Sequence, residues 1–185
     1  MTHLGICHSV GCASLGIKTI GYDEDNALIG NLESGDFEVS EPNLLELFKN
    51  NRDNISFCAN SVELEKCDIV FISSDVPTDS KGESSLDTIY NLIDKVSSKL
   101  SKSSLLVILC QVPPGFSRRL SFPKDRLFYQ VETLIFGRAM ERVLRPERFI
   151  VGCNNADNDL PFIYEQYLLR FECPILVMRY ESAEL

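Results

Sequence analysis

The stretch from Thr2 to Asp23 constrains the fold of this chain more than any other. It reads THLGICHSVGCASLGIKTIGYD: a short apolar start, a glycine, a second apolar segment and a β-prone run that ends on an acidic residue. We predict a short strand, a tight turn at Gly5, a helix from about Ser9 to Leu15 and a second strand ending at Asp23. In a βαβ unit of this order, the helix N-terminus points N–H groups at a pyrophosphate and the strand-end carboxylate accepts hydrogen bonds from a ribose diol.

The glycine fingerprint of such a unit is incomplete here. Where G-x-G-x-x-G is expected, the chain has Gly5, Cys7 and Val10, with Gly11 one place late. The span from Cys7 to Lys18 leaves only about ten residues for turn, helix and return, at the lower limit of roughly 10–12 for a βαβ crossover. Dinucleotide binding and a βαβ packing unit without a ligand are therefore both open at this stretch.

Length and composition predict one domain over residues 1–185 and argue against several functional classes. Of the 185 residues, 44% are hydrophobic, which is enough for a real core. The net charge of -9, with no basic cluster to offset it, argues against a nucleic-acid or anionic-membrane surface. No apolar run reaches membrane-spanning length and no charged-then-apolar signal segment opens the chain, so we expect a cytoplasmic protein that does not enter a membrane.

The cysteines indicate a reducing compartment rather than a metal site or a disulfide framework. There are seven of them, an odd number, and no C-x-x-C pair, and the chain has only two histidines. We therefore expect no metal and reduced, mostly buried thiols.

Strand-like and helix-like segments alternate along the chain. We predict further strands at 55–59, 67–74, 105–112, 128–131, 149–152 and 174–178, and helices at 25–32, from Pro42 to Phe48, 84–100, 134–144 and 160–171. This alternation predicts an α/β fold, a single doubly wound, mostly parallel, Rossmann-like sheet with ligands at the carboxyl ends of its strands.

Polar residues gather where three of the predicted strands end. Asp75-Val76-Pro77-Thr78 follows one strand, Gln111 to Gly115 the next and Glu132-Thr133 a third. Such loops suit a crevice that holds a polar ligand. Alternatively, their prolines and glycines do no more than terminate the strands.

The order of several blocks gives the chain a family resemblance. The segments CDIVFISSDVPTDSKGESSLDTI, LLVILCQVPPGFSR, YQVETLIFGRAMERVLRPERFIVG and the closing ESAEL resemble, in this order, the N-terminal domain of the UDP-glucose/GDP-mannose dehydrogenase family. The resemblance spans essentially the whole chain. It implies an NAD-binding domain of enzymes that oxidise the C6 hydroxyl of a nucleotide sugar, a UDP-hexose or GDP-mannose, to a carboxylate for polysaccharide biosynthesis.

The resemblance also implies roles for particular residues. Cofactor binding falls on the phosphate turn Gly5, Ile6, Cys7 and His8, the ribose acceptor Asp23, and the loop over the nicotinamide side, Val76, Pro77 and Thr78. Two catalytic roles follow. Gln111 falls where the family often has a threonine that holds a water, and Glu132 falls on a glutamate that serves in acid–base chemistry.

Departures from the family pattern leave two hypotheses open. Leu28 stands where a basic residue often helps to hold the adenosine end, and Phe136 where a second glutamate often contacts the cofactor. The sequence ends at Leu185, before the family's catalytic lysine and nucleophilic cysteine, so activity of this chain alone is uncertain. The chain is either the NAD-binding domain of a nucleotide-sugar dehydrogenase or a truncated, non-catalytic fragment that serves as a nucleotide-binding or association module. The sequence does not specify the sugar, and it leaves the oligomeric state open, a homo-oligomer included.

Overall fold

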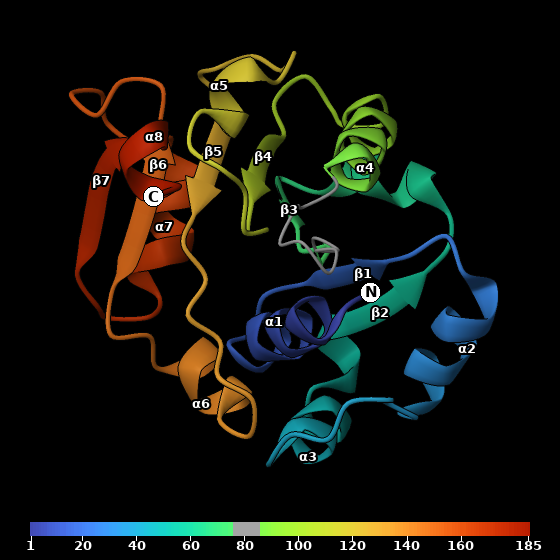
Figure 1. Ribbon diagram of the computed structural model, residues 1–185. Coiled ribbons are helices and arrows are strands. Elements are labelled where there is room, and N and C mark those ends of the chain that lie inside the picture. The colour runs from blue at the N-terminus through green and yellow to red at the C-terminus, as the bar shows by residue number, and fades with distance from the viewer. Residues whose placement is uncertain (76–85) are drawn as a thin grey trace, which may run out of the picture. The chain divides into compact units, whose positions relative to one another are not determined.

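The computed structural model describes residues 1–75 and 86–185. Its internal contacts divide the chain into two compact units, Met1–Glu63 with Thr133–Pro146 (unit 1) and Leu64–Glu132 with Glu147–Leu185 (unit 2). Each unit has its own sheet, of two and five strands respectively (Figure 1). The assignment of residues 1–185 to one NAD-binding domain stays a prediction.

Unit 1 begins with a helix, α1 (His3–Ser14), so the predicted strand and turn at the start of the chain are wrong. Thr2 is the N-cap, and its hydroxyl accepts a hydrogen bond from the Gly5 N–H at 3.3 Å. Threonine is a good capping residue, and the small and apolar residues after it contain no proline. Gly5 therefore lies inside the first turn of a helix, and helical hydrogen bonding begins with the Ile6 N–H donating to the Thr2 carbonyl at 2.9 Å.

The other elements of unit 1 follow the predicted order. They are β1 (Thr19–Tyr22), α2 (Asn26–Ser34), α3 (Leu44–Asn50), the 3₁₀ turn η1 (Arg52–Asn54), β2 (Ile55–Cys58) and, after the chain returns, α6 (Ala139–Leu144); a second 3₁₀ turn, η2 (Ser61–Lys66), leads into unit 2. Strands β1 and β2 pair in parallel. Asp25 caps α2 through the Ala27 and Leu28 N–H groups, and Gly35, with φ of 80°, ends it.

Helix α1 is the centre of the unit 1 core. It packs against α3, α6 and both strands, and its buried face meets Phe48, Phe57 and Val143. A Cβ on Gly11 would collide with the Val143 side chain, so this glycine permits the close approach of α1 to α6. Helix α6 is shorter than predicted because Gly137, with φ of 78°, interrupts helical geometry just before it.

Unit 2 confirms the prediction of a mostly parallel α/β sheet. Its strand order is β3-β4-β5-β6-β7, and only the β5–β6 pair is antiparallel. The elements are β3 (Ile69–Ile72), α4 (Asp87–Ser97), β4 (Leu105–Ile108), α5 (Phe116–Arg119), β5 (Leu127–Gln130), β6 (Phe149–Cys153), α7 (Phe162–Leu169), β7 (Ile175–Arg179) and α8 (Tyr180–Ala183).

Helices α7 and α8 lie on opposite faces of the β5–β7 part of this sheet (Figure 1). Phe149 of β6 packs edge-on against Phe171, just after α7, whereas Gly152 of the same strand lies against Ala183 of α8. Residues three apart in a strand point to opposite faces, so the two contacts require one helix on each side. Within the described residues, no helix is both long enough and apolar enough to span a bilayer.

Candidate functional site

The first candidate site lies in unit 1, where the carboxyl end of β1 meets the start of α1. Asp23 follows β1 directly, and its carboxylate forms an ion pair with the amino group of Met1, the residue before the Thr2 cap. The Asp23 side chain is 26% exposed, and its Oδ1 also accepts a hydrogen bond from the Asp25 N–H at 3.0 Å. A carboxylate has about four lone-pair sites, so these two partners leave room for a ribose diol.

The N-terminus of α1 supplies the second feature of this site. The N–H groups of a helix's first turn have no acceptor within the helix and carry the positive end of its dipole. No acidic side chain of α1 itself lies in that turn. The structure thus brings a helix N-terminus and Asp23 together, which is the pairing that a pyrophosphate and its ribose need.

The residues predicted to form the phosphate turn do not form one. Ile6, Cys7 and His8 are buried in α1 together with Gly5. Burial lowers the pKa of His8 to about 4, which keeps its imidazole neutral near pH 7. The predicted turn is therefore wrong, because the four residues lie in a helix. Cofactor binding by these residues stays a prediction. Val76, Pro77 and Thr78 lie outside the described residues.

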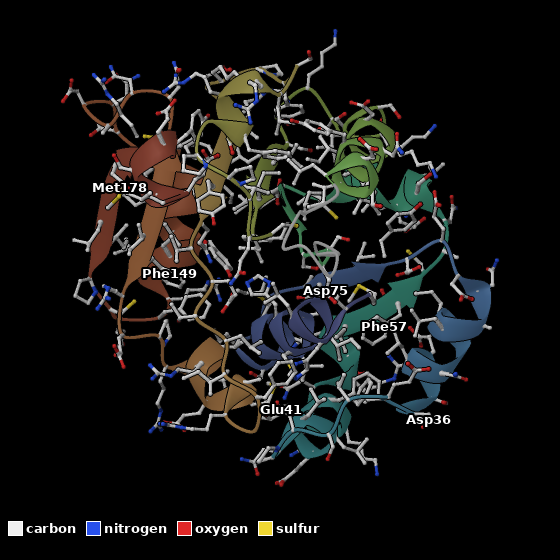
Figure 2. The ribbon with its side chains drawn as sticks, viewed as in Figure 1. Asp36, Glu41, Phe57, Asp75, Phe149 and Met178 are labelled. Atoms are coloured by element: carbon white, nitrogen blue, oxygen red, sulfur yellow. The ribbon has the colours of Figure 1, made fainter. Side chains whose placement is uncertain are left out.

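A buried carboxylate that the sequence analysis missed organises the same end of α1. Glu41, labelled in Figure 2, has a side chain only 1% exposed and lies between α1 and α6. Its Oε1 lies 3.0 Å from His3 Nε2, and its two oxygens accept hydrogen bonds from the N–H groups of Gly137 at 2.8 Å and Ala139 at 3.0 Å. The His3 ring also stacks on Phe136, with centroids 4.6 Å apart and planes 16° apart. One acidic residue therefore holds the first residue of α1 and the segment before α6.

The two predicted catalytic residues belong to unit 2. Gln111 lies three residues after β4 and is exposed, and Glu132 lies two residues after β5 and is half-buried. Strands β4 and β5 are parallel neighbours, with Ile108 opposite Tyr129. The carboxyl ends of parallel neighbours meet at one edge of a sheet, so both residues follow the same edge.

The turn after Gln111 is held by the last helix of the chain. Glu184, which is buried, accepts hydrogen bonds from the Gly115 N–H at 2.5 Å and the Ser117 N–H at 2.8 Å. Arg118 pairs with Glu181 at 2.9 Å and holds the pKa of that carboxyl at about 2. These contacts fasten α8 to the turn, and they lie too far apart in the sequence for any local pattern to indicate them.

The cysteines whose pKa shifts are resolved are protonated thiols. Burial raises the pKa of Cys110 to about 12, and burial also raises those of Cys153 and Cys173. A reactive thiolate needs an electropositive, accessible setting, and the buried Cys110 and Cys153 lack that accessibility.

Parallel strand pairing and helices on both faces of a sheet define a Rossmann-type α/β fold. The fold agrees with solved structures: a UDP-D-ManNAc dehydrogenase from Pyrococcus horikoshii (TM-score 0.88, 18% identity, 99% of this chain and 46% of that one) and a UDP-glucose dehydrogenase from Pyrobaculum islandicum (TM-score 0.81, 24% identity, 99% and 45%).

The family follows from the sequence match. Residues 1–168 match the model of the UDP-glucose/GDP-mannose dehydrogenase family, NAD binding domain, and the chain belongs to this family. It is 31% identical to the UDP-glucose 6-dehydrogenase of Rickettsia conorii over 85% of this chain and 38% of that protein. It is 28% identical to an uncharacterized protein of Methanocaldococcus jannaschii over 99% of this chain and 22% of that protein. The chain thus spans well under half the length of these relatives.

Proposed function

We propose that this chain is the NAD-binding part of a nucleotide-sugar dehydrogenase that oxidises the C6 hydroxyl of a UDP-hexose or GDP-mannose to a carboxylate in the cytoplasm. The observation that carries the proposal is the position of Asp23, at the end of a parallel strand and beside the N-terminus of α1. Family membership supports it, because the matched segment is the family's NAD binding domain.

In this proposal the residues of unit 1 bind and orient the cofactor. Asp23 accepts hydrogen bonds from the adenine ribose diol, and its negative charge repels the 2′-phosphate of NADP. The first turn of α1 donates N–H groups to the pyrophosphate. When bound, NAD would accept a hydride from the carbon that bears the alcohol. The segment Val76 to Thr78 keeps its predicted role over the nicotinamide side.

The residues of unit 2 handle water and protons in this proposal. Gln111 can donate from its amide nitrogen and accept at its oxygen, which lets it orient a water molecule. The half-buried Glu132 carboxylate accepts a proton from that water or from the substrate hydroxyl.

Cofactor titration by calorimetry tests the role of Asp23. We expect NAD to bind more tightly than NADP. Asp23→Asn should weaken NAD binding by roughly 10- to 100-fold, the equivalent of one charge-assisted hydrogen bond of about 1.5–3 kcal/mol. Asp36→Asn removes the same charge from an exposed residue of unit 1, labelled in Figure 2, and should leave both affinities unchanged. NADP binding as tight as NAD binding would refute the role of Asp23.

A spectroscopic assay for NADH separates the cofactor-binding proposal from complete catalysis. The purified chain should produce no NADH from a UDP-hexose or GDP-mannose even at high protein concentration, because none of the residues in this proposal binds the nucleotide sugar and holds its alcohol carbon against the cofactor. Added to a polypeptide that carries the remaining domains of a relative, it should support turnover, which Glu132→Gln should abolish and Glu65→Gln, a change at an exposed residue, should not. Tight NAD binding without any such turnover would favour the alternative, a non-catalytic nucleotide-binding module.

A further inference from the structure

The most exposed aromatic ring among the described residues of unit 1 stands beside the N-terminus of α1. Phe136 is 81% exposed. It is not a loose side chain, however, because one face of its ring stacks on the imidazole of His3 in nearly parallel planes. Phenylalanine is usually buried, so a phenyl ring held with its other face toward solvent is an unusual feature.

The buried carboxylate of Glu41 holds both residues of this stack in place. This carboxylate binds both the His3 ring and the backbone N–H of Gly137, the residue that follows Phe136. Glu41 therefore contacts the His3 ring directly and restrains Phe136 through the backbone of the next residue. A ring ordered in advance loses little conformational freedom when a ligand stacks on it, which favours binding.

The stack lies close to the elements that carry the proposed NAD site. His3 is the first residue of α1 and is two residues from Met1, whose amino group pairs with Asp23. Two residues of extended chain span at most about 7 Å. A ligand that reaches Asp23 and the α1 N-terminus is therefore within reach of the Phe136 ring.

We propose that the outer face of Phe136 stacks on a planar nitrogen heterocycle of the bound dinucleotide. This inference rests on the proposed NAD-binding function and adds to it an aromatic contact residue. Stacked aromatic pairs prefer the centroid separation that His3 and Phe136 already show, and a third ring can continue the stack on the free face. Ring stacking requires no charge, which suits a residue beside the carboxylate of Glu41.

Calorimetric titration of NAD into three variants tests the contact. Stacking of a base on an aromatic side chain is lost on alanine substitution, so Phe136→Ala should weaken NAD binding by about 5- to 100-fold. Phe136→Tyr retains the ring and should stay within about twofold of the wild type. Ile135→Ala removes apolar surface from the neighbouring exposed residue and should also have no effect. An affinity of Phe136→Ala equal to that of the wild type would overturn the inference.

A fluorescent reporter separates the two rings of the dinucleotide. The chain contains no tryptophan, so Phe136→Trp introduces a single indole at the proposed contact. NAD should quench its emission. Quenching by ADP-ribose identifies the adenine as the stacked ring, and quenching by nicotinamide mononucleotide identifies the nicotinamide. If the wild type binds no NAD, the proposed function fails; if NAD binds tightly but quenches nothing and Phe136→Ala is unaffected, only the present inference fails.

Discussion

Replacement of Glu41 by glutamine should destabilise unit 1 far more than the loss of one charge explains. The carboxylate accepts from two backbone N–H groups, contacts His3 Nε2 at 3.0 Å and is almost completely buried. Glutamine keeps the shape of the side chain but replaces one acceptor oxygen with an NH₂ group, so at least one buried donor then faces another donor. A buried donor without a partner costs about 1–3 kcal/mol, and each bond to a charged group contributes about 1.5–3 kcal/mol. We therefore expect Glu41→Gln to lower the free energy of unfolding by about 2–4 kcal/mol.

Urea denaturation followed by circular dichroism measures this change, and amide hydrogen exchange locates it. The Gly137 and Ala139 amides should exchange roughly 30- to 1000-fold faster in Glu41→Gln, because about 1.4 kcal/mol corresponds to a factor of ten. Glu38→Gln makes the same charge change at an exposed residue of the same loop and should stay within about 0.5 kcal/mol of the wild type. Equal stability of the two variants, with unchanged exchange at both amides, would refute the argument that Glu41 anchors this end of α1.

Three further predictions follow from buried groups and close contacts. Burial holds the pKa of His8 at about 4 in the folded chain, against 6.5 in the unfolded chain. Between these two pH values the unfolded chain therefore binds a proton at His8 that the folded chain does not bind. The free energy of unfolding should be at its full value above pH 6.5 and should fall by about 3 kcal/mol toward pH 4. Urea titrations at several pH values should show a smaller loss for His8→Leu. Gly11→Ala should destabilise by about 1–3 kcal/mol through its collision with α6, whereas Gly30→Ala, in open space on α2, should stabilise by about 0.5–1 kcal/mol; thermal melts in which both have one sign would contradict this. Tyr164→Phe should cost about 1–3 kcal/mol in urea titrations, since the buried Gln130 Oε1 then loses the hydroxyl that donates to it at 2.9 Å, and no loss would mean that water replaces the hydroxyl.

The strands were predictable because their signal is local. The run from Leu105 to Ile108 is continuously apolar, and all four residues are buried in β4. Similar short runs bounded by Pro, Gly or polar residues predicted β2, β3, β6 and β7. The helix predicted at 25–32 likewise starts at Asp25, which caps α2, because capping chemistry operates over three or four residues.

The start of the chain was misread because Gly5 was taken for the turn glycine of the fingerprint. In that fingerprint the third glycine does not turn the chain; it lets the helix pack closely on a strand. Gly5 lies within the first turn of α1, where this third glycine belongs. Three residues before it stands Thr2, which caps the helix. A local pattern cannot distinguish these two uses of glycine without knowing which residue caps the helix.

Glu41 could not be predicted from the sequence because its partners are distant. The two N–H groups that donate to it lie 96 and 98 residues further along the chain. Nothing in the loop around Glu41 has the periodicity of a buried element, and a lone acidic residue in such a loop is usually solvated. The contacts of Glu184 with Gly115 and Ser117 span a similar distance, 67 to 69 residues. Both carboxylates act through tertiary contacts that local propensity does not encode.

Asp23 and Glu41 show how two carboxylates at one helix end take different roles. Glu41 is buried and has three nitrogen partners, so its oxygens are already engaged in holding His3 and the segment before α6. Asp23 is a quarter exposed and has two partners, so it keeps acceptor capacity that faces solvent. Burial commits the first carboxylate to the fold, and exposure leaves the second available to a ligand. For this reason Glu41→Gln should lower stability, whereas Asp23→Asn should lower NAD affinity with a much smaller effect on unfolding.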